Sequence, residues 1–228
     1  LSRADLTDAV LVGADLSESD LTGVCLTRAA MMGTDLRRVD LDKATLREAN
    51  MAGANPYRAI LTGVDLVDAN LSWAFLGRSN LSKANLRHVD LSHAHAPEVN
   101  LGRANLEGAN LSQTNMPGAD LHRTNLKQAQ LSKANLSGAY LRHVDLEEAD
   151  LRETDLRGAN LINANMHRSD LRGANLCEAK LTGVHLRSPD LGHANLNKAN
   201  LTRASYNSNT VFPPGFDPKA NGMVRQDG

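Results

Sequence analysis

The chain has 228 residues and a formal net charge of −1, with 25 basic and 26 acidic side chains. This balance removes the simplest electrostatic argument for binding nucleic acid or an anionic membrane. Aromatic residues make up only 3% of the chain, too few for a globular core of mixed large side chains. No apolar run approaches the roughly 18–20 residues of a membrane span. The two cysteines cannot form a disulfide framework.

A large aliphatic residue recurs at every fifth position from Leu1 onward, and we call it the centre of each unit. Of 42 centres, 35 are Leu and 4 are Met. Two residues before the centre, 26 of 41 positions hold Ala, and one residue before it, 29 of 41 hold Asp or Asn. The register does not slip before Tyr206, so no long loop interrupts the repeat.

A period of five fits neither common secondary structure. On an α-helix, five residues turn by about 500°, so successive centres would be smeared around the axis. On a continuous strand, centres five apart would point to alternate faces. A short extended segment with a bend every five residues turns all centres inward, and Asp, Asn and Gly tolerate such bends. The sequence therefore predicts a solenoid filled by columns of leucine.

The outward residue two after each centre indicates how many units make one coil. Identical residues recur in 7 of 37 comparisons four units apart, against 2 of 38 at three units and 4 of 36 at five. A separation of two units gives 6 of 39. The comparison favours a coil of four units but does not prove it.

The unit reads Ala–Asp/Asn–Leu–X–X, as in residues 4–6, 14–16, 104–106 and 174–176. In this motif the chain resembles the pentapeptide-repeat proteins over roughly residues 1–208. The resemblance implies an all-β fold, a right-handed quadrilateral β-helix with four units per coil. We expect about ten coils stacked at roughly 4.8 Å, which would make a rod near 50 Å long.

The C-terminal segment breaks the pattern, and we divide it into a cap at 209–218 and a flexible tail at 219–228. The cap contains two of the three Phe residues, and we expect Val211, Phe212 and Phe216 to cover the last leucine layer. Residues 206–218 resemble the endings of many cyanobacterial pentapeptide-repeat proteins. The polar residues after the cap are expected to fray.

The first coil has no comparable cover, since Leu1, Leu6, Leu11 and Leu16 are already in register. We expect either a missing upstream segment of a larger chain, or stacking of this coil on another molecule, end to end or as a dimer. An outward apolar patch near these coils offers a second contact: Val10, Val12, Ala30, Met32 and Ala52.

Carboxylates and histidines raise the question of a metal or catalytic site. The Asp residues just before the centres, such as Asp145, Asp150 and Asp155, form a column, but Asp and Asn also exchange there as bend-forming residues. His88, His93 and His95 are close in sequence, yet His93 and His95 flank a bend and read as solvated surface residues. We therefore predict no metal site.

No catalytic or cofactor-binding motif is present either. The sequence contains no phosphate-binding loop, nucleophile elbow, HExxH or CxxC motif. Cys25 and Cys177 lie too far apart along the rod for a disulfide and are expected to be free thiols. A filled rod without long loops offers no concave pocket, so we predict no enzyme and no cofactor.

Unusual residues gather in one region, around a column of centres that contains Pro56 and Ala96. Tyr, Trp and Arg are enriched in protein interfaces. The alternative is neutral variation of outward positions, with Phe75 folding over a small neighbour. The predicted partner-binding residues are Trp73, Phe75, Tyr57, Arg38, Arg58 and Arg78.

These observations favour a non-enzymatic structural or protein-binding module whose partner is an unidentified protein, with no nucleic acid and no membrane contact. The alternative is the activity best known in the family, mimicry of DNA to bind gyrase in quinolone resistance. Such members are strongly acidic, whereas this chain is charge-balanced and its column of three arginines has the opposite sign. The compartment is not encoded in this segment, and cytoplasm is our default expectation.

Overall fold

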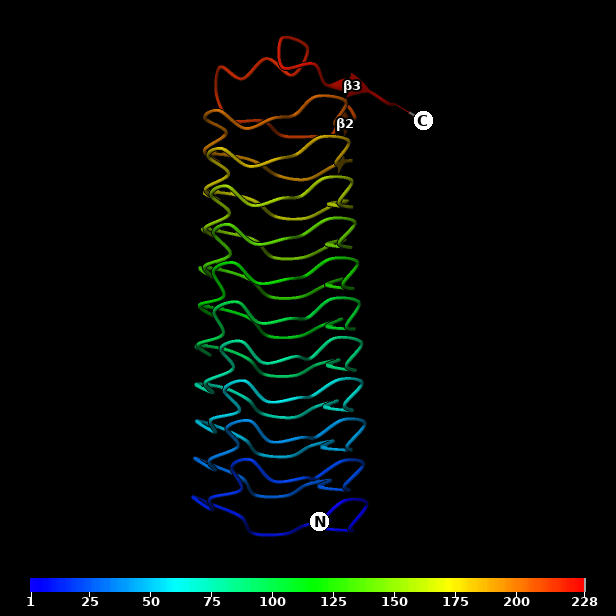
Figure 1. Cartoon of the computed structure of the whole chain (residues 1–228). Helices are drawn as coiled ribbons and strands as arrows, with labels where there is room; N and C mark the ends of the chain where they lie inside the picture. The colour runs from blue at the N-terminus through cyan, green and yellow to red at the C-terminus, as the bar shows by residue number, and fades with distance from the viewer. Residues whose placement is uncertain (228) are drawn as a thin grey trace.

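The computed structural model describes residues 1–227 as a straight tower of stacked coils (Figure 1), with no helix in that range. Single-residue parallel bridges join equivalent positions four units apart, as in Asp5 to Cys25 and Asn105 to Asn125. Each coil therefore contains four units, and the predicted β-helix is confirmed. Regular strands occur only near the end, as β1 (His185–Leu186), β2 (Ser205–Tyr206) and β3 (Val224–Arg225).

The residue two after each centre lies in the left-handed backbone region throughout the repeat. All 41 such positions from Arg3 to Arg203 have positive φ, and only 11 of them are glycine. The centre carbonyl accepts a hydrogen bond from the N–H three residues later, so the bends are β-turns with a left-handed third residue. The corner after Leu186 is an exception, because Pro189 has no N–H and the Leu186 carbonyl accepts from the Thr210 hydroxyl instead. This repeated turn makes the corners of the coil.

In a unit with Asp or Asn before the centre, all five backbone N–H groups can find acceptors, as residues 135–139 show. Leu136 and Gly138 donate to carbonyls of the next coil, both at 2.8 Å, and Asn135 donates to the previous coil at 2.8 Å. Ala139 closes the turn by donating to the Leu136 carbonyl at 3.0 Å. The remaining N–H, that of Ser137, donates to Oδ1 of Asn135 at 3.1 Å. The Asp or Asn before the centre thus supplies, in most units that have one, the acceptor that the coil-to-coil ladder leaves out; Asn85 is an exception, because its Oδ1 has no partner.

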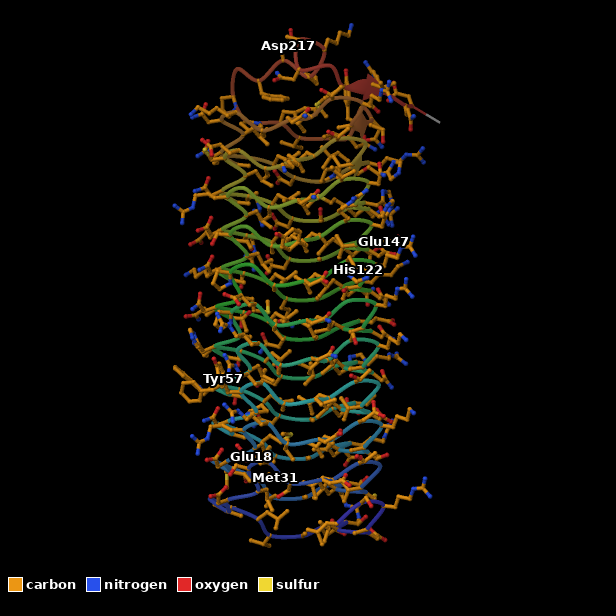
Figure 2. All side chains as sticks on the ribbon, in the orientation of Figure 1. Glu18, Met31, Tyr57, His122, Glu147 and Asp217 are labelled. Carbon is orange, nitrogen blue, oxygen red and sulfur yellow. The ribbon has the colours of Figure 1, made fainter. Side chains whose placement is uncertain are left out.

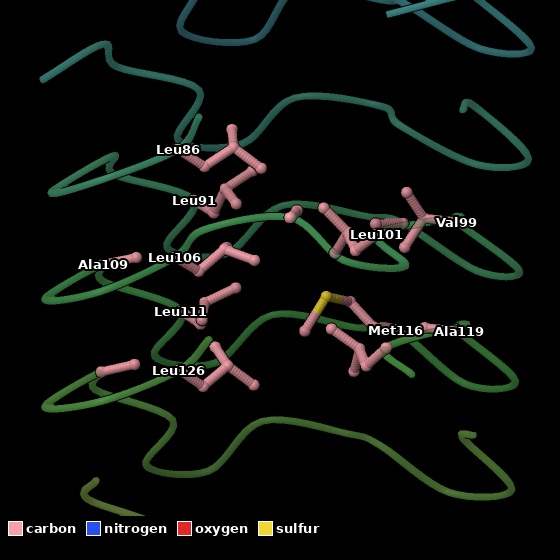
Figure 3. Packing of buried hydrophobic residues seen from close by; sticks show 14 of the residues in the cluster. Leu86, Leu91, Val99, Leu101, Leu106, Ala109, Leu111, Met116, Ala119 and Leu126 are labelled. Carbon is pink, nitrogen blue, oxygen red and sulfur yellow. The ribbon is translucent and has the colours of Figure 1, made fainter. Parts of the chain in front are cut away.

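The interior is filled by the centres and by the small residues two before them. Every Leu or Met centre from Leu21 to Leu191 is at most 3% exposed. Leucines of successive coils stack in columns, as with Leu86, Leu106 and Leu126 in Figure 3. Buried threonine hydroxyls donate to backbone carbonyls of their own or of the preceding coil: Thr34 donates to the Met31 carbonyl at 2.7 Å, and Thr124 donates to the Leu101 carbonyl at 2.9 Å.

The C-terminal segment closes the tower with aromatic side chains. Phe212 packs edge-on against Tyr206 with ring centroids 5.5 Å apart, and it stacks on Phe216 at 5.2 Å. Both phenylalanines contact the core, whereas Val211 is 50% exposed and pairs with Asp190 instead.

The structure differs from the expected flexible tail at 219–228. β3 pairs in parallel with β2, which itself pairs with β1. Met223 is only 7% exposed, because the chain returns over the last coil and buries this one apolar side chain. The ordered cap therefore extends beyond 209–218, and only residue 228 lies outside the described residues.

The left-handed corners predict opposite effects of two substitutions. Gly138 has φ +66° and no atom within 4 Å of the place a Cβ would take, so Gly138→Ala adds backbone strain without a clash. We expect a loss of about 1–2 kcal/mol in the free energy of unfolding, the cost of a left-handed L-residue. Urea denaturation measures it.

The reverse change serves as the check. Gln113 has φ +57°, and Gln113→Gly should raise the free energy of unfolding by several tenths of a kcal/mol, because relief of the strain outweighs the freedom that the unfolded chain gains. Gln113→Ala controls for loss of the side chain. A destabilising glycine would contradict this account of the corner.

Candidate interaction surface

The Asp and Asn residues before the centres do not form the single column expected from the sequence. Asp145, Asp150 and Asp155 lie on three different sides of the tower, because equivalent positions are 20 residues apart. Most of these side chains accept hydrogen bonds from the backbone. Side-chain oxygens of Asp15, Asn70 and Asn135 each accept from the N–H two residues later, at 2.9–3.1 Å. Neighbouring coils add side-chain ladders, such as Asn135 Nδ2 to Asn115 Oδ1 at 2.8 Å. Within residues 1–227, no group of three or more His, Cys, Asp or Glu side chains could hold a metal ion.

The three neighbouring histidines point to different partners. The His88 ring lies against Gly108, and His95 Nδ1 is 3.0 Å from Asn115 Nδ2. His93 stacks on Trp73 with centroids 4.3 Å apart and an interplanar angle of 6°. These contacts place two of the histidines beside the predicted aromatic residues.

The structure brings Trp73, Phe75 and Tyr57 onto one side of the tower and its two bordering corners. Trp73 is 61% exposed and Phe75 is 50% exposed. Phe75 meets His95 of the next coil edge-on, with ring centroids 6.4 Å apart. We call Trp73, Phe75, Tyr57, His93 and His95 the aromatic face.

A glycine makes room for the tyrosine of this face. A Cβ at Gly77 would lie 3.3 Å from two ring carbons of Tyr57 and 3.4 Å from Cδ of Pro97. The Tyr57 ring therefore lies against Gly77 of the next coil, at the edge of the tower (Figure 2). Its N–H donates to Asn55 Oδ1 at 3.3 Å, which fixes the backbone beneath it.

The predicted column of three arginines is largely neutralised. Arg38 Nη1 lies 3.1 Å from Glu18 Oε1, and Arg78 Nε lies 2.9 Å from Glu98 Oε2. The hydrogen bond to Glu98 raises the pKa of Arg78. Arg58 instead places its guanidinium carbon 5.3 Å from the centroid of the Tyr57 ring, a cation–π contact. Arg58 is therefore the arginine that borders the aromatic face.

His93, His95 and Gly77 were not among the partner-binding residues predicted from the sequence. Each lies one coil beyond an aromatic residue of the face, so the coil register itself is the signal that identifies them. Whether this face binds a partner stays a prediction.

The second predicted surface lies on the first coils. Val10 is 80% exposed, Val12 is 51% and Met32 is 43%. The centres Leu6 and Leu11 are half-buried, in contrast to the fully buried centres above them. Stacking of another molecule on this end also stays a prediction.

The repeat has counterparts among known proteins. A family model described as pentapeptide repeats (8 copies) matches residues 1–38, 40–78, 65–103, 100–138, 139–176 and 179–205. No curated protein matches the chain.

Solved structures give further similarities. HetL, a pentapeptide-repeat protein involved in heterocyst differentiation regulation in the cyanobacterium Nostoc sp. strain PCC 7120, is 35% identical; the match covers 90% of this chain and 87% of HetL, with a TM-score of 0.41. A trypsin-treated variant of QnrB1, a plasmid-mediated fluoroquinolone resistance protein, is 16% identical, with coverage of 80% and 89% and a TM-score of 0.63. The latter similarity shows the fold alone.

Ion pairs on the tower predict how its stability depends on pH. Hydrogen bonds from Arg152 and Arg172, opposed by partial burial, hold the pKa of Asp150 and of Asp170 below its ordinary value. A carboxylate with a lowered folded-state pKa stabilises above its unfolded pKa of about 3.9, and this contribution is lost as pH falls through the folded value. We expect the thermal midpoint to decline below about pH 4 for this reason.

The matched variant is Arg152→Gln with Arg172→Gln. It should lose less stability than the wild type between pH 5 and pH 2, as measured by circular dichroism, because protonation of Asp150 and Asp170 then breaks no ion pair with an arginine. Parallel pH profiles for the two proteins would show that these pairs do not contribute.

Proposed function

The chain belongs to the pentapeptide-repeat family, and on that premise we propose that it is a non-enzymatic, rigid rod that binds a protein partner through its aromatic face. The exposed, stacked Trp73 is the single observation that carries the proposal. Large aromatic side chains dominate interface energetics, and their exposure on a repeat of mostly polar outward residues is unusual. The binding residues are Trp73, Phe75, Tyr57 and Arg58.

The geometry supports binding because the face is already ordered. Trp73 is stacked on His93, and Tyr57 is packed over Gly77, so neither ring needs to give up much rotamer freedom when a partner arrives. The backbone beneath them is held to both neighbouring coils by hydrogen bonds. Arg58 adds a cation next to the Tyr57 ring, and it has no carboxylate within 4 Å in residues 1–227.

The DNA-mimic alternative gains no support from the charge distribution. Mimicry of a duplex requires a continuous negative face, whereas Arg37, Arg152 and Arg157 each cover an Asp on the flat sides of the tower. The similarity to QnrB1 concerns the fold and says nothing of gyrase binding by this chain.

No described helix is long and apolar enough to cross a membrane.

The proposal predicts that Trp73→Ala with Arg58→Ala abolishes partner capture while leaving the fold intact. Truncation of such anchors commonly weakens a complex by about 2 kcal/mol or more, roughly 30-fold. The measurement is affinity capture from a native lysate by wild type and variant, followed by titration of whichever protein differs.

The control is Gln113→Ala with Lys133→Ala. It truncates two side chains at the same corner of the tower as Trp73, two and three coils closer to the C-terminus. It should capture as the wild type does. Equal capture by all three proteins, with equal thermal midpoints, would remove the aromatic face as the binding site.

A further inference from the structure

One edge of the tower carries an excess of positive charge. This corner holds the residues one and two after the centres Leu1, Leu21, Leu41 and every fourth centre thereafter. It contains seven basic residues and one carboxylate, Asp42. We call its basic residues the basic edge: Arg3, Lys43, Lys83, Arg103, Arg123, Arg142 and Arg203. The next corner along the chain, by contrast, carries six basic and six acidic residues.

Cations elsewhere on the tower are mostly paired, whereas those in the middle of this edge are not. Arg28, Lys127 and Arg168 represent the next corner, and each has a carboxylate oxygen within 4 Å. Lys43 reaches Asp42 at 3.6 Å. In residues 1–227, no carboxylate lies within that distance of Lys83, Arg103, Arg123 or Arg142, which occupy four successive coils.

A hollow of about 470 Å³ opens beside these cations. Arg103, Arg123, Arg142, His143 and the 56%-exposed Tyr140 line it. The one carboxylate in its wall is Asp120, whose Oδ1 lies 2.8 Å from His122 Nδ1 and accepts from the His122 N–H at 3.1 Å.

Gly102 makes room for the His122 side chain at this hollow. The His122 ring lies directly over Gly102, at a distance that excludes any Cβ there. In this position the imidazole contacts Asp120, whose side chain stays 41% exposed, and the guanidinium groups remain exposed to a ligand. The arrangement therefore presents unpaired positive charge next to an acid that is already hydrogen-bonded.

We infer that the basic edge binds an extended acidic peptide segment, rich in Asp or Glu, that runs along the tower axis. Arginine forks bind carboxylates with charge-assisted, often bidentate hydrogen bonds. The coils of Lys83 and Arg142 are three coil steps apart, a distance of about 14 Å along the tower. An extended peptide of about four to five residues spans this distance. The Tyr140 ring supplies an apolar contact for the peptide stem.

The rest of the surface favours a peptide over a nucleic acid. Since the basic edge holds seven of the 25 basic residues and its corner one of the 26 acidic ones, the other surfaces are net acidic. A narrow peptide meets only the edge. A duplex, whose phosphate rows border a groove about 12 Å wide, would also face the acidic surroundings.

The test is fluorescence anisotropy of a labelled hexaglutamate peptide with the full chain at 50 mM NaCl. The wild type should bind hexaglutamate and not hexaglutamine, and 300 mM NaCl should weaken binding because surface charge is screened. Arg103→Gln with Arg123→Gln should weaken binding at least tenfold. Arg152→Gln with Arg172→Gln, the same charge change at the diagonally opposite corner, should change it less than twofold.

Three results would overturn the inference: no hexaglutamate binding by the wild type, equal loss in the two double variants, or tighter binding of a 12-base-pair DNA duplex than of the peptide. The Trp73→Ala with Arg58→Ala protein should bind hexaglutamate as the wild type does. This separates the basic edge from the aromatic face, so either proposal can fail alone.

Discussion

The pairing of backbone N–H groups is the constraint on which this tower depends. In most units the coil-to-coil ladder with the turn bond pairs four of the five backbone donors. Where Asp or Asn precedes the centre, its side chain accepts from the fifth donor, as Asn135 does for Ser137. Where Ala30 or Ile60 stands at that position instead, no such side-chain oxygen is present. Leucine burial provides the driving force, and the side-chain acceptors pair most of the donors that the ladder leaves out.

Positions around the cross-section of the tower therefore differ in how freely they can vary. The inner positions and most residues before the centre are committed to the core and the backbone, so the two corner residues of each unit are the freest to vary. Both surfaces of interest use the corners, and both depend on a glycine in the adjacent coil. Gly77 admits the Tyr57 ring and Gly102 admits the His122 ring. A large side chain therefore lies against the tower when the neighbouring coil has no Cβ at that corner.

Much of this could be predicted from the sequence. The five-residue period identifies the fold, because no helix or continuous strand would bury all the centres together. The buried columns of centres confirm this fold. The return of the chain at Met223 could not be predicted, since one apolar residue in a polar segment carries no periodicity. Arg38 pairs with Glu18 of the preceding coil. This ion pair was missed because the arginines were considered without the residues 20 positions before them. The basic edge becomes visible only when charges are compared between corners, after carboxylates that already have a partner are set aside.

Spin-label distances along one corner test the four-unit coil most directly. Cys25 and Cys177 are replaced by Ala, and labelled cysteines are introduced in pairs, at Glu48 with Gln128 and at Glu48 with Arg168. In four-unit coils these pairs lie four and six coil steps apart, which predicts about 19 Å and about 29 Å between the labelled backbone positions. A three-unit coil would place more steps between the same residues, and the resulting distances of about 26 Å and about 38 Å would contradict the account.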